Sequence, residues 1–233
     1  MDIWNKQYKN IAIKADYRVH DKILELLNKT SLRHGDLLDI ACGEGALAQR
    51  IIDENPGLNV DVNDINLSSI FCQGYKNKYS VDLNKQNFEF PKQYDVIIAV
   101  EIIEHIENPW NFMRAVRRAL KPGGVILLST PNIDSIFDRI FFLIYGYHFY
   151  FGERGIVNSG GHITMVPMWL INHMCMSSRM KIIHQCHVDT SPHHGLRYRL
   201  LKLFLSQILM LAKNRNDASI NILQINSITQ EGV

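Results

Sequence analysis

The sequence predicts an α/β fold, with a seven-stranded, mostly parallel sheet, helices on both faces and a helical cap inserted in the C-terminal half. Apolar runs of strand length alternate with helical patterns through residues 30–135, which is typical of parallel strands joined by right-handed crossovers. The chain has 233 residues and 46% apolar content, which suits one domain with a cap. We therefore expect a single domain over 1–233, with its core at about 30–135 and the cap and last strand pair at about 136–233.

The first strand and the turn after it organise this core. An amphipathic helix over Asp16–Leu27 comes first, and the apolar run Leu37–Ile40 then leads through Gly43 and Gly45 into a helical pattern. Glycines allow a backbone to approach a ligand closely, and the start of a helix directs free N–H groups at an anionic group. Asp39, near the carboxyl end of the strand, can accept hydrogen bonds from a cationic amino group and would repel a pyrophosphate.

The second and third strands are shorter. Leu58–Val62 alternates like a strand, and Asp64 follows it, in a position where a carboxylate can accept hydrogen bonds from both hydroxyls of a ribose. A helix over 67–75 and a short strand near 79–81 come next, before Asp82 and Leu83.

The remaining strands of the core follow the same alternation. Tyr94–Val100 is a buried strand, and a helix is expected from Trp110 to Leu120. The segment Lys121-Pro-Gly-Gly124 predicts a turn, because proline ends a helix and glycine permits positive φ. The next strand covers 125–129 and ends before Thr130-Pro131-Asn132.

Four motifs, taken together, point to one family. They are Asp39-Ile-Ala-Cys-Gly-Glu-Gly45, Asp64, Tyr94-Asp95 with Glu101-Ile-Ile-Glu104-His105, and Lys121-Pro-Gly-Gly124 with Thr130-Pro-Asn132. In order and spacing they resemble class I S-adenosylmethionine-dependent methyltransferases, which have a Rossmann-like sheet. Within that class, the Glu-Ile-Ile-Glu-His segment is most similar to the group containing ubiquinone-biosynthesis O-methyltransferases and small-RNA 2′-O-methyltransferases.

The resemblance implies S-adenosyl-L-methionine as the cofactor. Its amino-acid end would lie at the glycine loop, its ribose at the end of the second strand, and its adenine near the end of the third. The implied cofactor-binding residues are Asp39, Ala41, Gly43, Gly45, Asp64, Ile65, Asp82, Leu83 and Val100.

Catalysis is expected at the end of the fourth strand. Glu101, Glu104 and His105 are spaced i, i+3, i+4, so they share a face if the segment is helical. Two carboxylates and an imidazole could hold Mg²⁺ or Mn²⁺, which would lower the pKa of an acceptor hydroxyl. His162 matches a later histidine of the RNA-modifying relatives. The sequence favours the simpler, metal-free hypothesis, in which His105 or His162 is the general base.

The second half of the chain bears on the acceptor. It contains an apolar, aromatic stretch over 136–151, a helix over 167–176 and two final strands over 180–188 and 219–227, expected to be antiparallel. A long apolar helix is expected over 196–212, with Arg197, Arg199 and Lys202 at its start. The core, a dimer partner or a membrane surface could cover its excess of apolar side chains.

These features favour O-methylation of a small-molecule, glycan or lipid-linked hydroxyl. Alternatives are an RNA 2′-O-methyltransferase, although no RNA-binding module is recognisable and a nucleic-acid partner is not expected, and a non-catalytic cofactor-binding subunit. A nicotinamide dehydrogenase lacks a second mononucleotide half here. Four cysteines without a C-x-x-C pair and an N-terminus without a signal-peptide pattern predict a cytoplasmic protein, with peripheral contact at the inner face of a membrane as one option.

Overall fold

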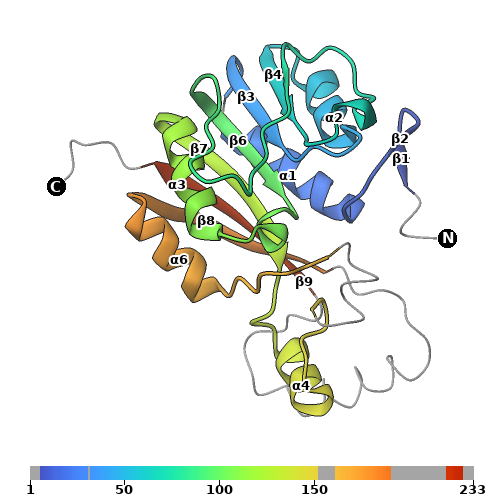
Figure 1. Cartoon of the computed structure of the whole chain (residues 1–233). Coiled ribbons are helices and arrows are strands. Elements are labelled where there is room, and N and C mark those ends of the chain that lie inside the picture. Colours follow the sequence, from blue (N-terminus) through green and yellow to red (C-terminus); the bar gives the residue numbers. More distant parts are fainter. Residues whose placement is uncertain (1–5, 31, 152–160, 190–218, 228–233) are drawn as a thin grey trace.

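The computed structural model describes residues 6–30, 32–151, 161–189 and 219–227. Seven strands form one sheet in the order β5-β4-β3-β6-β7-β9-β8 (Figure 1). β3, β4, β5, β6 and β7 run parallel, and β9 runs antiparallel to both β7 and β8. This confirms the expected mostly parallel sheet and its antiparallel last pair. The strands are β3 (Gly35–Ile40), β4 (Leu58–Asn63), β5 (Lys78–Tyr79), β6 (Tyr94–Val100), β7 (Leu120–Pro131), β8 (Met180–Asp189) and β9 (Ser219–Ser227).

Helices cover both faces of this sheet, because alternate residues of each central strand point to opposite sides. In β3, Leu37 packs with α1 and α2, whereas Leu38 and Ile40 pack with α3 and α6. A small hairpin, β1–β2, precedes the sheet. The remaining elements are β1 (Gln7–Tyr8), β2 (Ile11–Ala12), α1 (Tyr17–Lys29), α2 (Ala46–Glu54), α3 (Pro109–Ala119), α4 (Ile136–Tyr145) and α6 (Met168–Ser177).

One local expectation was wrong. The helix expected over 67–75 is only a 3₁₀ turn, η1 (Leu67–Ser69). The side chain of Asn66 accepts hydrogen bonds from the backbone and hydroxyl of Ser68, which stabilises a turn in competition with a helix. The expected turn at 121–124 is present as a bulge inside β7: the helix before it ends at Ala119, Gly123 has a φ of 75°, and the pairing with β6 shifts between Leu120 and Val125.

The two ends of the connection between β8 and β9 lie next to each other at one edge of the sheet. Asp189 pairs with Ser219, and Ile220 pairs with Pro131 at the carboxyl end of β7. The helix expected over 196–212 lies outside the described residues. Among the residues that are described, none of the helices combines the length and apolarity needed to cross a membrane.

Candidate active site

The carboxyl ends of β3 and β6 meet at one edge of the sheet. Asp39 is paired with Ile98 and Ile40 with Ala99, so the loops that follow the two strands leave the sheet side by side. Ligands of open α/β sheets bind at this edge. The glycine loop and the Glu101–His105 segment therefore lie next to each other, as the motifs predicted.

The glycine loop depends on backbone conformations that most residues avoid. Ala41, Gly43 and Gly45 have φ values of 54°, 56° and 86°. A Cβ on Gly45 would lie 2.5 Å from Sγ of Cys72, so only glycine fits there without displacing a neighbour. Gly43 is partly exposed in this loop, whereas Gly45 is buried at the start of α2.

Asp39 and Asp64 are the two acids beside this loop. Asp39 is buried, and its Oδ2 has no hydrogen-bond partner among the described residues. Burial and the nearby Asp64 raise the pKa of Asp39 to about 7. Asp64 accepts hydrogen bonds from the backbone N–H groups of Gly43 (2.8 Å) and Asn66 (2.9 Å). An unpartnered buried carboxylate oxygen is costly, and a cationic ligand group would relieve that cost.

The positions expected near adenine follow neighbouring strands but differ in exposure. Ile65 comes after β4 and is largely exposed, whereas Leu83 comes after β5 and is buried in the core on the α3 side. Asp82 accepts a hydrogen bond from the backbone of Asn84 at 3.0 Å. Val100 ends β6 and is half-buried. Ile65 and Asp82 are thus accessible to a ligand, while the side chain of Leu83 serves packing.

The end of β7 holds the two glutamates. Oγ of Ser129 donates to Oε1 of Glu101 at 2.7 Å, and Oγ1 of Thr130 donates to Oε2 of Glu104 at 3.1 Å. Only a single 3₁₀ turn, η2 (Ile103–His105), forms here, so the two glutamates do not share a regular helical face. Burial raises the pKa of Glu101 to about 7 and that of Glu104 well above its ordinary value, with the Glu101 charge adding to the second shift.

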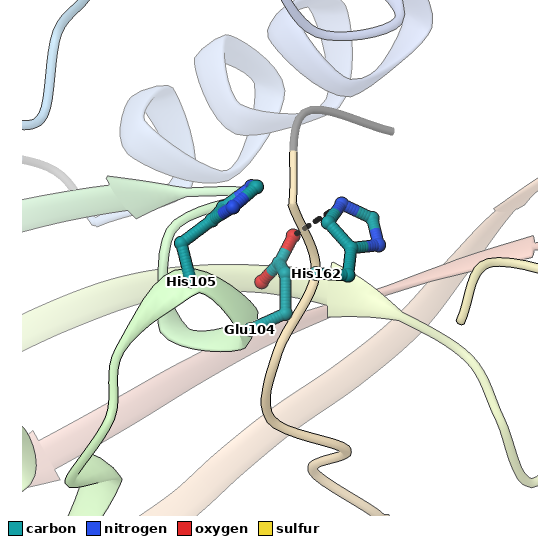
Figure 2. Close-up of side chains that lie close together, drawn as sticks. All are labelled: Glu104, His105 and His162. Carbon is teal, nitrogen blue, oxygen red and sulfur yellow. Dashed lines mark ion pairs between the residues drawn. The ribbon is translucent and has the colours of Figure 1, made fainter. Parts of the chain in front are cut away.

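His162 reaches this site from a distant part of the chain. The backbone N–H groups of Ile163 and Thr164 both donate to the carbonyl oxygen of Glu104 at 2.9 Å, which places the segment beside η2. Nε2 of His162 lies 3.8 Å from Oε1 of Glu104, and that oxygen has no hydrogen-bond partner in the described part of the chain (Figure 2). The rings of His105 and His162 are 4.8 Å apart between centroids.

Both imidazoles have one nitrogen occupied by the backbone. Nδ1 of His105 lies 3.2 Å from the carbonyl oxygen of Gly161, and Nδ1 of His162 lies 3.0 Å from that of Tyr150. A carbonyl oxygen can only accept, so each Nδ1 carries the proton and each Nε2 keeps its lone pair. Burial lowers the pKa of both residues, that of His162 to about 4 with His105 contributing. Both rings are therefore neutral at pH 7.

Three of the four expected catalytic residues form a cluster that could hold a metal ion. One ligand atom each from Glu104, His105 and His162 lies within 4.8 Å of the others. Glu101 is not part of this cluster. Its carboxylate instead accepts the hydrogen bond from Ser129.

Comparison with known proteins identifies the family. A family model described as a methyltransferase domain matches residues 11–187. The chain belongs to the class I S-adenosylmethionine-dependent methyltransferases. Family membership implies S-adenosylmethionine as the cofactor, and it excludes the dehydrogenase alternative.

Sequence similarity to a curated relative covers less than half of this methyltransferase, whereas similarity of fold covers most of it. It is 34% identical over 103 residues to a ubiquinone biosynthesis O-methyltransferase of Rickettsia bellii, covering 42% of each chain. The methyltransferase thus spans less than half the length of that curated relative. A putative methyltransferase of Bacillus halodurans C-125 shares the fold, with a TM-score of 0.62, 14% identity, and coverage of 90% of this chain and 100% of the other. The magnesium protoporphyrin IX methyltransferase of Synechocystis PCC 6803 has a TM-score of 0.58 and 13% identity, with 90% and 82% covered.

The structure also shows methyltransferase residues that sequence reasoning missed. Oε2 of Glu44 accepts a hydrogen bond from the backbone of Ala12 (3.0 Å), and Oε1 pairs with Nζ of Lys14 (2.8 Å). The β1–β2 hairpin is thereby attached to the glycine loop. At the start of α1, Asp16 holds Arg18 through two side-chain hydrogen bonds, and the charge of Asp16 contributes to the raised pKa of Glu101. The contacts of Glu44 with Ala12 and Lys14, and the effect of Asp16 on Glu101, join residues far apart in sequence, so no local pattern marks them.

Proposed function

We propose that this methyltransferase transfers the methyl group to a hydroxyl oxygen of a small-molecule, glycan or lipid-linked acceptor. The observation that carries the proposal is the Glu104–His105–His162 cluster at the strand edge beside the glycine loop. An alcohol must lose its proton to become a methyl acceptor, and this cluster is the group of side chains at the edge best suited to promote that loss. The similarity to O-methyltransferases of ubiquinone biosynthesis adds support.

We assign the cluster to a divalent cation, Mg²⁺ or Mn²⁺, in preference to a histidine base. The residues fit such an ion, because Oε1 of Glu104 has no hydrogen-bond partner in the described structure and both Nε2 atoms keep their lone pairs. A cation held there would lower the pKa of the acceptor hydroxyl. His162, with its pKa lowered to about 4, is by contrast a weak proton acceptor at pH 7.

The cofactor residues fit the amino-acid end and ribose of S-adenosylmethionine. The unpartnered Oδ2 of Asp39 suits the cofactor's ammonium group, and the backbone around Gly43 and Gly45 can lie against its carboxylate. Asp64 has lone pairs for the ribose hydroxyls. The cofactor supplies an electrophilic methyl group, so the protein mainly has to align the acceptor with it and exclude water.

A metal-dependence assay tests the proposal. Chelator-treated protein is assayed for release of S-adenosylhomocysteine with hydroxylated small molecules, lipid-linked glycans and a single-stranded RNA oligonucleotide as acceptors. We expect Mn²⁺ to restore turnover, and His162→Ala or Glu104→Gln to reduce kcat by roughly 10²-fold or more with little change in cofactor affinity. His173→Ala is the matched control, because His173 is an exposed histidine of α6 that contacts Trp110.

The outcomes separate the two mechanisms. Turnover that survives both chelation and His162→Ala contradicts the metal assignment. Turnover that survives chelation but is lost in His105→Ala supports the histidine base instead. Methylation of amines but not of hydroxyls contradicts O-methyl transfer altogether.

A further inference from the structure

The C-terminal end of α4 carries four consecutive apolar residues that are all exposed. Phe142, Leu143, Ile144 and Tyr145 have exposed fractions of 47%, 83%, 57% and 56%, and we call these four residues the apolar tip. Successive residues of a helix are about 100° apart around its axis, so four in a row point to every side. In Figure 1 the helix is set apart from the layered body of the domain, beyond one end of the sheet.

This all-round exposure discriminates between the possible partners. A helix or a flat dimer interface covers one stripe of a helix and would leave the opposite side of the tip in water. The interfacial layer of a bilayer surrounds whatever enters it, and it accepts Phe, Leu, Ile and Tyr together. We propose that the apolar tip inserts into the surface of a membrane that contains anionic lipids.

The charges near the tip favour an anionic surface. Arg139 of α4 is exposed, and its nearest acid is Asp134 at 3.9 Å. Asp138, the acidic residue of α4, is buried and paired with His148, so no exposed acidic side chain lies on this helix. Basic side chains near an anionic bilayer contribute to binding in a salt-sensitive manner.

The connection between β8 and β9, which lies outside the described residues, has a sequence of similar character. The connection between Asp189 and Ser219 starts and ends beside the carboxyl end of β7, from which the chain continues into α4. Its sequence combines Arg197, Arg199 and Lys202 with nine apolar residues between 200 and 211. Both features are those of a membrane-surface segment.

The chain that follows the apolar tip is held against α4 and leads back to the active site. Oδ1 of Asp138 accepts a hydrogen bond from the backbone of Phe149 at 2.7 Å, which fastens the chain after the tip to α4. Phe141 packs against Phe149, with ring centroids 5.2 Å apart. Tyr150 then offers its carbonyl oxygen to His162. If the proposed O-methyl transfer holds, a membrane-bound acceptor could reach the cluster without leaving the lipid.

Vesicle sedimentation tests the inference, with vesicles of phosphatidylcholine alone or mixed with phosphatidylglycerol. We expect the full chain to pellet with the anionic vesicles at low salt and less at high salt. Leu143→Glu/Ile144→Glu should lower the partition coefficient at least about tenfold, because each buried apolar side chain contributes about that factor or more. Met176→Glu, the same kind of change at an exposed apolar residue of α6, should leave binding unchanged.

Three results would overturn the inference. The first is wild-type protein that stays in the supernatant with both kinds of vesicle. The second is a loss of vesicle binding in Met176→Glu as large as that in the double variant. The third is a stable dimer, seen in sedimentation velocity, that the double substitution dissociates. Circular dichroism and S-adenosylhomocysteine affinity confirm that the double variant is folded. Vesicle binding needs neither cofactor nor acceptor, so a failure to bind vesicles does not contradict the proposed O-methyl transfer. Conversely, wild-type protein that binds vesicles but methylates no hydroxyl contradicts the proposed reaction and not the membrane inference.

Discussion

Asp39→Asn should make the cofactor-free protein more stable while it weakens cofactor binding. The pKa of Asp39 is raised from about 3.8 to about 7, chiefly because the carboxyl group is buried. A shift of about three units corresponds to about 4 kcal/mol, which is the destabilisation the charged side chain causes above pH 7. Asparagine has nearly the same shape and carries no charge, so it removes this penalty.

The sign and the pH range follow from the two pKa values. Below about pH 3.8 Asp39 is protonated in both the folded and the unfolded chain, so asparagine confers no electrostatic advantage. Between about pH 3.8 and 7 the folded state holds a proton that the unfolded state has lost, so wild-type stability falls as the pH rises. The advantage of asparagine therefore grows through this range and is constant above about pH 7.

Urea unfolding at pH 5 and pH 8, without cofactor, measures the effect. We expect the free energy of unfolding of Asp39→Asn to exceed that of wild type by about 4 kcal/mol at pH 8 and by less than half of that at pH 5. The same substitution at Asp53 is the control, because hydrogen bonding to Lys9 lowers the pKa of Asp53, and its loss should be destabilising instead. S-adenosylhomocysteine should bind Asp39→Asn at least about tenfold more weakly. Equal or lower stability of Asp39→Asn at pH 8 would refute the reasoning.

Further variants probe the loop and the edge. Gly45→Ala should lower stability by roughly 1–3 kcal/mol, because its Cβ meets Cys72 and its φ is 86°, and Cys72→Ala should recover part of the loss in thermal unfolding. Glu44→Ala should raise KM for S-adenosylmethionine roughly fivefold with kcat nearly unchanged, because it detaches the β1–β2 hairpin from the glycine loop. Glu101→Ala and His105→Ala should lower kcat more than cofactor affinity in steady-state assays, and wild-type turnover in both would contradict a catalytic role for this edge.

The core of the fold could be predicted because its signals are local. The strand over Leu37–Ile40, its glycine turn and the helix after it are encoded within a few residues of one another, and the structure has all three. Tyr94–Val100 was predicted with the bounds that β6 has. The helix over 67–75 failed for a local reason too, since the hydrogen bonds of the Asn66 side chain stabilise a turn there.

The candidate site could be predicted only in part, because its decisive contacts are tertiary. Spacing alone placed Glu101, Glu104 and His105 together. Which partner each glutamate has depends on β7, where Ser129 donates a hydrogen bond to Glu101 and Thr130 donates one to Glu104. His162 joins Glu104 across a long stretch of chain, and only the resemblance to a family suggested it. Exposure cannot be read from a sequence either, so the apolar stretch over 136–151 gave no sign that 142–145 would be exposed on every side.

The same edge of the sheet explains why this protein should depend on its ligands for stability. Asp39 and Glu104 are buried, Glu101 is half-buried, and all three have raised pKa values, so near neutral pH the folded chain either retains protons or contains charged groups in a poorly solvated environment. The ammonium group of the cofactor at Asp39 and a divalent cation at Glu104 would each displace a proton and neutralise the carboxylate charge. Ligands that bind only the folded state stabilise it by mass action. We therefore expect S-adenosylmethionine and Mn²⁺ each to raise the unfolding temperature and, because each competes with a proton at a carboxyl group of raised pKa, by more at pH 8 than at pH 6.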